Sequence, residues 1–97
     1  MEESRVERWV TDRIRRMGGR SYKWVSPGNE GVPDRIYLLP GGRIIFAELK
    51  AEKGRLSKLQ EAQIRKIRSL GFTCEVIRGR EGAEEFMRNL ENEIRAT

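Results

Sequence analysis

Residues 33–50 read PDRIYLLPGGRIIFAELK, in which two runs of mainly aliphatic and aromatic residues flank the sequence Pro40-Gly41-Gly42. Glycine adopts positive φ angles at little cost, and tight connections between antiparallel strands require such angles. We therefore expect a β-hairpin whose loop consists of these three residues. Counting outward from the loop places Asp34 directly opposite Glu48, at the open end of the hairpin.

The predicted register brings two carboxylates together. Directly opposed side chains in a hairpin have Cβ atoms about 5 Å apart, and two like charges at that distance destabilise the strand pair. A shared cation removes this cost, and oxygen ligands favour Mg²⁺ or Mn²⁺. Such an ion can polarise a phosphoryl oxygen and lower the pKa of an attacking water. Asp34 and Glu48 are therefore a candidate metal site.

Lys50 lies two residues after Glu48, and alternate residues of a strand point to the same face. Its ammonium group is expected to orient the attacking water or to neutralise charge in the transition state. Two simpler explanations stay open. A D…ExK spacing also occurs by chance, and a one-residue bulge in the turn would send Asp34 to the other face.

Further elements are predicted on both sides of the hairpin. Hydrophobic periodicity indicates helices over residues 4–17, 57–70 and 82–96 and strands over residues 21–25 and 72–78. Residues 26–33, SPGNEGVP, form a loop. The strand, helix and strand between residues 43 and 78 should form a right-handed crossover that joins two parallel strands. The expected fold is α/β, with helices on the faces of a mixed four-stranded sheet.

The composition limits the available chemistry. The 97 residues are expected to form one domain with a small core, which dimerisation would enlarge. Histidine is absent, which excludes histidine bases, histidine-containing zinc sites and Ser-His-Asp triads. The excess of 20 Lys and Arg over 15 Asp and Glu favours a polyanionic partner. Catalysis would therefore rest on carboxylates, lysine and a hard metal ion.

Two features bear on localisation. Cys74 is the single cysteine, and its setting in FTCEVI is typical of a buried strand thiol in a reducing cytoplasm. No apolar run approaches the roughly 18 residues that a membrane span needs. We therefore expect a cytoplasmic protein that does not enter a membrane.

Residues 31–60, GVPDRIYLLPGGRIIFAELKAEKGRLSKLQ, resemble the VRR-NUC branch of the PD-(D/E)XK nucleases. The resemblance rests on Pro33-Asp34, the triplet Glu48-Leu49-Lys50, the segment LSKLQ that ends in Gln60, and a first-helix acid before Gly18-Gly19. It implies a restriction-endonuclease-like αβββαβ core, here followed by a C-terminal helix. It also implies a Mg²⁺- or Mn²⁺-dependent DNA endonuclease, similar to Holliday junction resolvases among the stand-alone members.

The resemblance also assigns roles at the centre of the motif. Asp34 and Glu48 match the metal-binding acids of the family, and Lys50 matches its catalytic lysine. The backbone carbonyl at the position of Leu49 often serves as a further metal ligand in the superfamily. The central motif shows no departure from the family pattern.

Two outer positions of the motif have a second explanation. Glu7 matches the first-helix acid, but residues 4–7 also spell a helix capping box, and Glu3 is a rival one helical turn earlier. Gln60 matches the glutamine of the family, but Ser57 and Gln60 also have the spacing of a capping box. Both Glu7 and Gln60 are candidate catalytic residues.

Several cations are candidates for binding DNA phosphates. The best placed follow the hairpin directly: Lys53, Arg55 and Lys58. Lys23 and Arg35 are weaker candidates. Trp9 and Trp24 are expected in the core or at a dimer interface rather than on a base-stacking platform.

The resemblance suggests branched DNA as the substrate and a bacterial or phage-infected cell as the setting. Because one chain carries one ExK centre, paired cuts on two strands would need a homodimer. Two other classes remain open. One is a noncatalytic DNA-binding module that retains a nuclease fold. The other is a basic scaffold protein on nucleic acid, for which the opposed acids would have no purpose.

Overall fold

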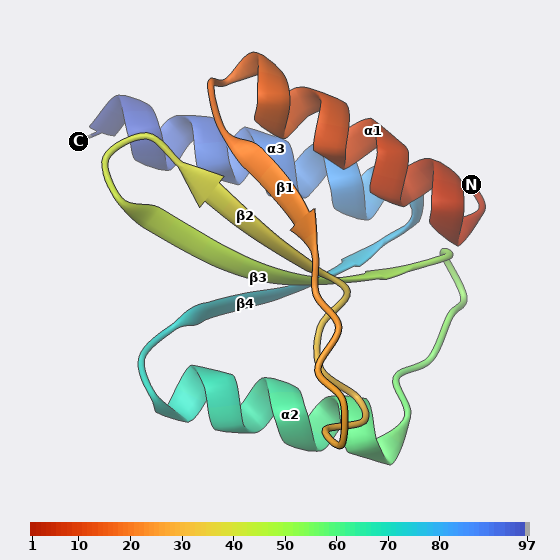
Figure 1. Ribbon diagram of the computed structural model, residues 1–97. Coiled ribbons are helices and arrows are strands. Elements are labelled where there is room, and N and C mark those ends of the chain that lie inside the picture. The colour runs from red at the N-terminus through yellow and green to blue at the C-terminus, as the bar shows by residue number, and fades with distance from the viewer. Residues whose placement is uncertain (97) are drawn as a thin grey trace.

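Four strands form one mixed sheet in the spatial order β1-β2-β3-β4, with three helices packed on it (Figure 1). The computed structural model describes residues 1–96. The elements in chain order are α1 (Glu3–Arg16), β1 (Arg20–Lys23), β2 (Arg35–Leu39), β3 (Arg43–Lys50), α2 (Lys58–Ser69), β4 (Thr73–Arg78) and α3 (Gly79–Ala96). The predicted α/β fold, with its αβββαβ order and C-terminal helix, is confirmed.

The β2–β3 hairpin has the register that the sequence predicts. Leu39 pairs with Arg43 across the loop, and Ile36 pairs with Phe46. Gly41 and Gly42 carry φ angles of 85° and 77°, which explains the need for glycine in the loop. Away from the loop, the last regular pair is Arg35 with Ala47. Continuing the register by one residue places Asp34 opposite Glu48. No bulge intervenes, so both acids lie on one face.

The strand β3 is central and pairs with neighbours of both orientations. It runs antiparallel to β2 and parallel to β4, as a crossover through α2 requires. In the parallel pair Glu48 lies beside Val76, and Lys50 lies beside Arg78. The parallel neighbour predicted for the hairpin is therefore present.

The helices cover the sheet unequally. Helices α1 and α3 lie together on one face and α2 lies on the other (Figure 1). The main core fills the first face and consists of Val6, Val10, Ile14, Tyr37, Leu39, Ile45, Ala47, Leu49, Ile77, Ala83, Met87 and Leu90. On the face of α2, Ile64 and Cys74 are buried, but Leu38 and Ile44 remain about 40% exposed. The cover of that face is therefore thinner at the end of the sheet that carries the hairpin loop.

Element boundaries differ from the sequence expectations at two places. The strand β1 covers residues 20–23 instead of 21–25, and α3 begins at Gly79, three residues before the predicted start. The charged residues that follow β4 lie on the first turn of α3. There Arg80 pairs with Glu84 at 3.6 Å, one helical turn later.

None of the helices within residues 1–96 has the length and hydrophobicity that crossing a membrane would require.

Candidate active site

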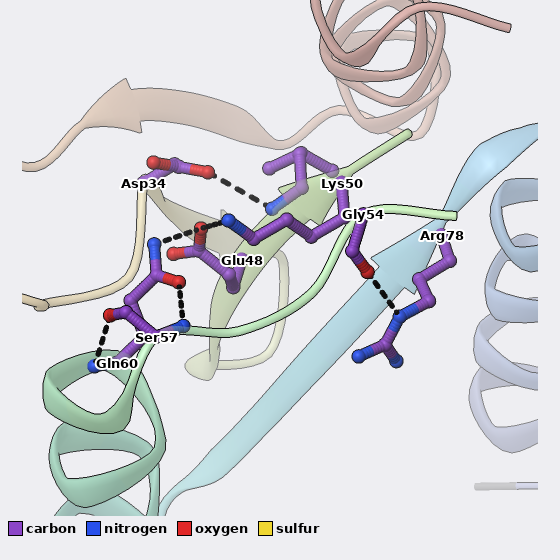
Figure 2. A network of polar contacts seen from close by, with 8 residues as sticks. Asp34, Glu48, Lys50, Gly54, Ser57, Gln60 and Arg78 are labelled. Atoms are coloured by element: carbon purple, nitrogen blue, oxygen red, sulfur yellow. Dashed lines mark hydrogen bonds and ion pairs between the residues drawn. The ribbon is translucent and has the colours of Figure 1, made fainter. Parts of the chain in front are cut away.

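The acidic pair lies where the hairpin opens. Asp34 ends the loop before β2, and its Oδ2 accepts a hydrogen bond of 3.0 Å from the backbone N–H of Leu49 (Figure 2). This bond ties the first acid to the strand that carries the second. The family motif Glu48-Leu49-Lys50 is thus joined to Asp34 through its middle residue.

Glu48 is a buried carboxylate with only 2% of its surface exposed. Removal from water and then the negative charge of Asp34 raise the pKa of Glu48 to about 7, while Lys50 acts in the opposite direction. Its Oε1 is buried and receives no hydrogen bond from residues 1–96. A buried acceptor of this kind is costly unless a proton or a cation reaches it.

Lys50 lies beside the second carboxylate oxygen. Its Nζ is 3.7 Å from Oε2 of Glu48, and its side chain is 15% exposed (Figure 2). At this distance the two groups form an ion pair rather than a close hydrogen bond. The ammonium group is therefore near the acids but can still contact another group.

Gln60 takes part in both of the interactions that the sequence suggested as alternatives. Its Nε2 donates to Oε2 of Glu48 at 3.0 Å, and its Oε1 accepts from the backbone N–H of Ser57 at 2.9 Å. The backbone N–H of Gln60 donates to Oγ of Ser57 at 3.1 Å, which completes the capping box of α2. The helix cap and the contact with the acidic pair share one side chain.

The two first-helix acids have different surroundings. Oε2 of Glu7 accepts from Nε of Arg35 at 2.7 Å, on the face opposite to Asp34 because neighbouring strand residues alternate. Glu3, in contrast, contributes to the raised pKa of Glu48. This contribution is the smallest of those that act on the pKa of Glu48, after burial, Asp34 and Lys50.

The candidate DNA-binding cations divide by location. Lys53, Arg55 and Lys58 are exposed on the connection after β3 and on the first turn of α2. Lys23 is exposed on β1, and it shares with its pairing partner Arg35 the face opposite to Glu48. Arg35 is engaged by Glu7.

Both tryptophans belong to the packed structure, as expected. Trp24 contacts Phe46 with ring centroids 5.3 Å apart, and Trp9 packs against the main core.

Arg78 is a residue that the motifs did not indicate. Its Nε donates to the carbonyl of Gly54 at 3.1 Å and so ties the connection after β3 to the end of β4 (Figure 2). The available signal was its parallel register beside Lys50. That register becomes known only once the crossover through α2 is defined.

The donor set of the site suits a hard cation. Within residues 1–96 no group of three or more His, Cys, Asp or Glu side chains is arranged to hold a metal ion. The acidic pair would have to be completed by a backbone carbonyl and water, which is the usual manner for Mg²⁺. The buried Oε1 of Glu48, which no donor satisfies, fits such an ion.

The mixed sheet carries two acids and a lysine at the open end of its central hairpin. The chain belongs to the VRR-NUC domain family, whose model matches residues 4–81.

Known proteins similar to this chain agree with that membership. A protein of Acyrthosiphon pisum secondary endosymbiont phage 1, named "Putative nuclease p44", is 38% identical over 77 residues, which are 79% of this chain and 83% of that protein. A solved structure described as a VRR_NUC domain has a TM-score of 0.82 at 25% identity and covers 89% of this chain and 94% of its own. A second, a VRR_NUC domain protein, has a TM-score of 0.70 at 17% identity, with 91% and 86% covered, and supports the fold alone.

Proposed function

We propose that this protein is a divalent-metal-dependent endonuclease that hydrolyses phosphodiester bonds in DNA. The observation that carries the proposal is the acidic pair of Asp34 and the buried Glu48, which keeps one oxygen without a hydrogen-bond donor beside a lysine. A like-charged, buried pair is unfavourable in the protein alone. A site that becomes favourable only with a cation is expected at a metal-dependent active centre.

Asp34, Glu48 and the carbonyl of Leu49 would hold the ion, Mg²⁺ or Mn²⁺. The N–H of Leu49 points to Asp34, and in a strand the N–H and C=O of one residue point to the same neighbour, which supports the carbonyl as a ligand. When bound, the ion supplies Lewis-acid polarisation of a phosphoryl oxygen and a water of lowered pKa. Oε2 of Glu48 already contacts Gln60 and Lys50, so Oε1 would be the oxygen available to a metal ion.

Lys50 would act in the chemical step. Its ammonium group is 3.7 Å from Glu48, so it can orient the attacking water or neutralise charge on the phosphoryl group. Gln60 would hold the carboxylate of Glu48 in place. Glu3 or Glu7 would supply the first-helix acid of the site. The charge of Glu3 on Glu48 favours Glu3 for that role.

The DNA backbone would run across the connection between β3 and α2. Lys53, Arg55 and Lys58 are exposed there, next to the acidic pair in the chain. Exposed cations at such a position hold phosphates and contribute affinity rather than sequence information. Lys23 and Arg35, on the other face, would have at most an auxiliary part.

Branched DNA, such as a Holliday junction, is the proposed substrate, and a homodimer is the proposed working unit. Two identical centres are needed for paired cuts on two strands, and one chain carries one. Several large apolar side chains are exposed and could be buried in a subunit interface, among them those of Leu38, Ile44 and Phe72. The phage relative supports the cytoplasm of a bacterium or phage-infected cell as the setting.

Cleavage of matched DNA substrates by the purified protein tests this function. Plasmid, linear duplex and four-way junction DNA are incubated with Mg²⁺ or with EDTA, and a Glu48→Gln variant is the matched control. Metal-dependent cuts that the variant fails to make support the proposal, and preference for the junction supports the branched substrate. Binding to DNA without any cleavage would instead identify a noncatalytic DNA-binding module.

A further inference from the structure

The side-chain amide of Gln60 contacts a hydrogen-bond donor on one side and a hydrogen-bond acceptor on the other. Ser57 offers a backbone N–H, which only the amide oxygen can accept, at 2.9 Å. Glu48 offers a carboxylate oxygen, which only the amide nitrogen can approach as a donor, at 3.0 Å. Of the two possible orientations of the amide, therefore, only the one observed satisfies both partners.

The reversed orientation would be unfavourable at both ends. It would direct the amide oxygen of Gln60 at the buried carboxylate of Glu48 and its NH₂ group at the N–H of Ser57. Two acceptors or two donors facing each other leave polar groups unsatisfied, which is most costly at the buried Glu48 and less so at the exposed Ser57. The contacts with Ser57 and Glu48 therefore favour the same orientation of the Gln60 amide.

Gly31, in the loop before β2, allows the first turn of α2 to approach that loop closely. A Cβ atom added to Gly31, which has φ +88°, would lie 2.6 Å from the carbonyl carbon of Leu59 and 2.8 Å from the backbone nitrogen of Gln60. Gln63 reaches the same loop, with Nε2 donating to the carbonyl of Glu30 at 3.4 Å. The first turn of α2 therefore lies directly on the backbone of the loop that leads to Asp34.

We propose that Ser57 is a positioning residue of the acidic site: through the capping box of α2 it orients the amide of Gln60 so that the nitrogen, and not the oxygen, faces Glu48. Gly31 allows the close approach that places the box there. The consequence for catalysis rests on the proposed nuclease function, whereas the orientation of the amide does not. Oε2 of Glu48 is thereby occupied, and Oε1 would remain available to a cation.

Three variants separate positioning from helix stability. Ser57→Ala keeps the backbone N–H that meets the amide oxygen of Gln60 but removes the Oγ acceptor that holds the first turn of α2 against it, so it tests whether the complete box is needed for the contact. Ser57→Asp replaces Oγ with another favoured N-cap. Ala62→Gly weakens the same helix without touching the box or changing the charge, by an amount of the same order as the loss of a cap. The primary measurement is NMR of the side-chain amide of Gln60 in the ¹⁵N-labelled, metal-free protein.

We expect Ser57→Ala to move the Gln60 side-chain signals toward those of a free glutamine amide, Ser57→Asp to restore them, and Ala62→Gly to leave them in place. The single-turnover cleavage rate should fall about fivefold in Ser57→Ala, the factor that corresponds to losing a typical cap, and less than about twofold in Ala62→Gly. Unmoved signals in Ser57→Ala, or equal movement in Ala62→Gly, would overturn the positioning role.

A fourth variant tests the direction of control. In Glu48→Gln the backbone N–H of Ser57 should stay protected from hydrogen exchange, because the box holds the amide without help from Glu48. Loss of that protection would show that Glu48 positions Gln60 and would reject the proposal. If no DNA is cleaved under any condition, the nuclease function fails, but the NMR and exchange results still decide the role of Ser57.

Discussion

Two charged pairs lie on opposite faces of the same end of the sheet, and they are compensated in opposite ways. Glu7 and Arg35 carry opposite charges, meet at 2.7 Å, and have side chains that are 23% and 20% exposed. Asp34 and Glu48 carry like charges, and Glu48 is buried. The first pair is complete within the protein, whereas the second needs a proton or a cation.

The comparison separates a structural site from a functional one without reference to any motif. An ion pair that neutralises itself gives no reason to expect a ligand, even though it contains a conspicuous acid. A buried pair of like charges is retained in a folded protein where something else is bound there. The face of α2 is therefore the face on which to seek the metal and the DNA.

The largest expected effect is on cleavage by variants of the acidic pair. Asp34→Asn or Glu48→Gln should lower the single-turnover rate at least ~100-fold, the scale expected when a key electrostatic group is removed. EDTA should abolish cleavage by the unaltered protein. The partly exposed Glu84 on α3 gives the matched control, since Glu84→Gln removes a carboxylate far along the chain from the site and breaks only a surface ion pair with Arg80. Near-normal rates in folded Asp34 and Glu48 variants would remove the proposed metal site.

The second effect is on the stability of the metal-free protein. The pKa of Glu48 is about 7 in the folded state, against an ordinary 4.5. Between these values the unfolded chain has released the proton that the folded protein still holds. The free energy of unfolding should therefore decrease as the pH rises from about 4.5 to about 7, by about 3 kcal/mol, and then stay level.

Urea denaturation in EDTA at several pH values measures this dependence. Glu48→Gln should remove most of it, and Mg²⁺ should raise the stability of the unaltered protein above pH 7 by binding the folded state. A Glu7→Gln variant should keep the dependence. A flat profile in the unaltered protein would mean that Glu48 is not held at an unfavourable charge.

The third effect distinguishes the lysine at the acids from the cations after β3. Lys50→Ala should lower the single-turnover rate at saturating DNA by about tenfold or more, because its charge acts at the reacting group. Substitution of Lys53, Arg55 or Lys58 should weaken binding instead. Each lost phosphate contact should reduce the slope of log affinity against log salt by about one unit. Equal loss of saturated rate in both groups would contradict the division.

The smallest effect concerns the first-helix acids. Glu7→Gln breaks a partly exposed ion pair and should reduce stability by about 1 kcal/mol or less. Glu3→Gln removes a negative charge that acts on Glu48, so it should change cleavage and Mg²⁺ affinity more than Glu7→Gln does. Kinetics and calorimetric Mg²⁺ titration of the two variants side by side measure the difference. The reverse ranking would return the role to Glu7.

Residues close in sequence were enough to determine the centre of the candidate site. Strand alternation and the Pro40-Gly41-Gly42 loop set the hairpin register, and the register alone brings Asp34 opposite Glu48 with Lys50 on the same face. These relations lie within an 18-residue segment, 33–50, where backbone geometry leaves little freedom. The seven elements followed from hydrophobic periodicity, with errors where charged residues open α3.

Only the tertiary structure decided what surrounds that centre. The sequence could not choose between Glu3 and Glu7, because the choice depends on how α1 lies against the sheet, 28 residues from Arg35. It presented the two roles of Gln60 as alternatives, whereas packing of α2 on the loop before β2 makes both compatible. The link from Arg78 to Gly54 requires the crossover to be complete. Such contacts are set by the packing of distant elements, on which local periodicity carries no information.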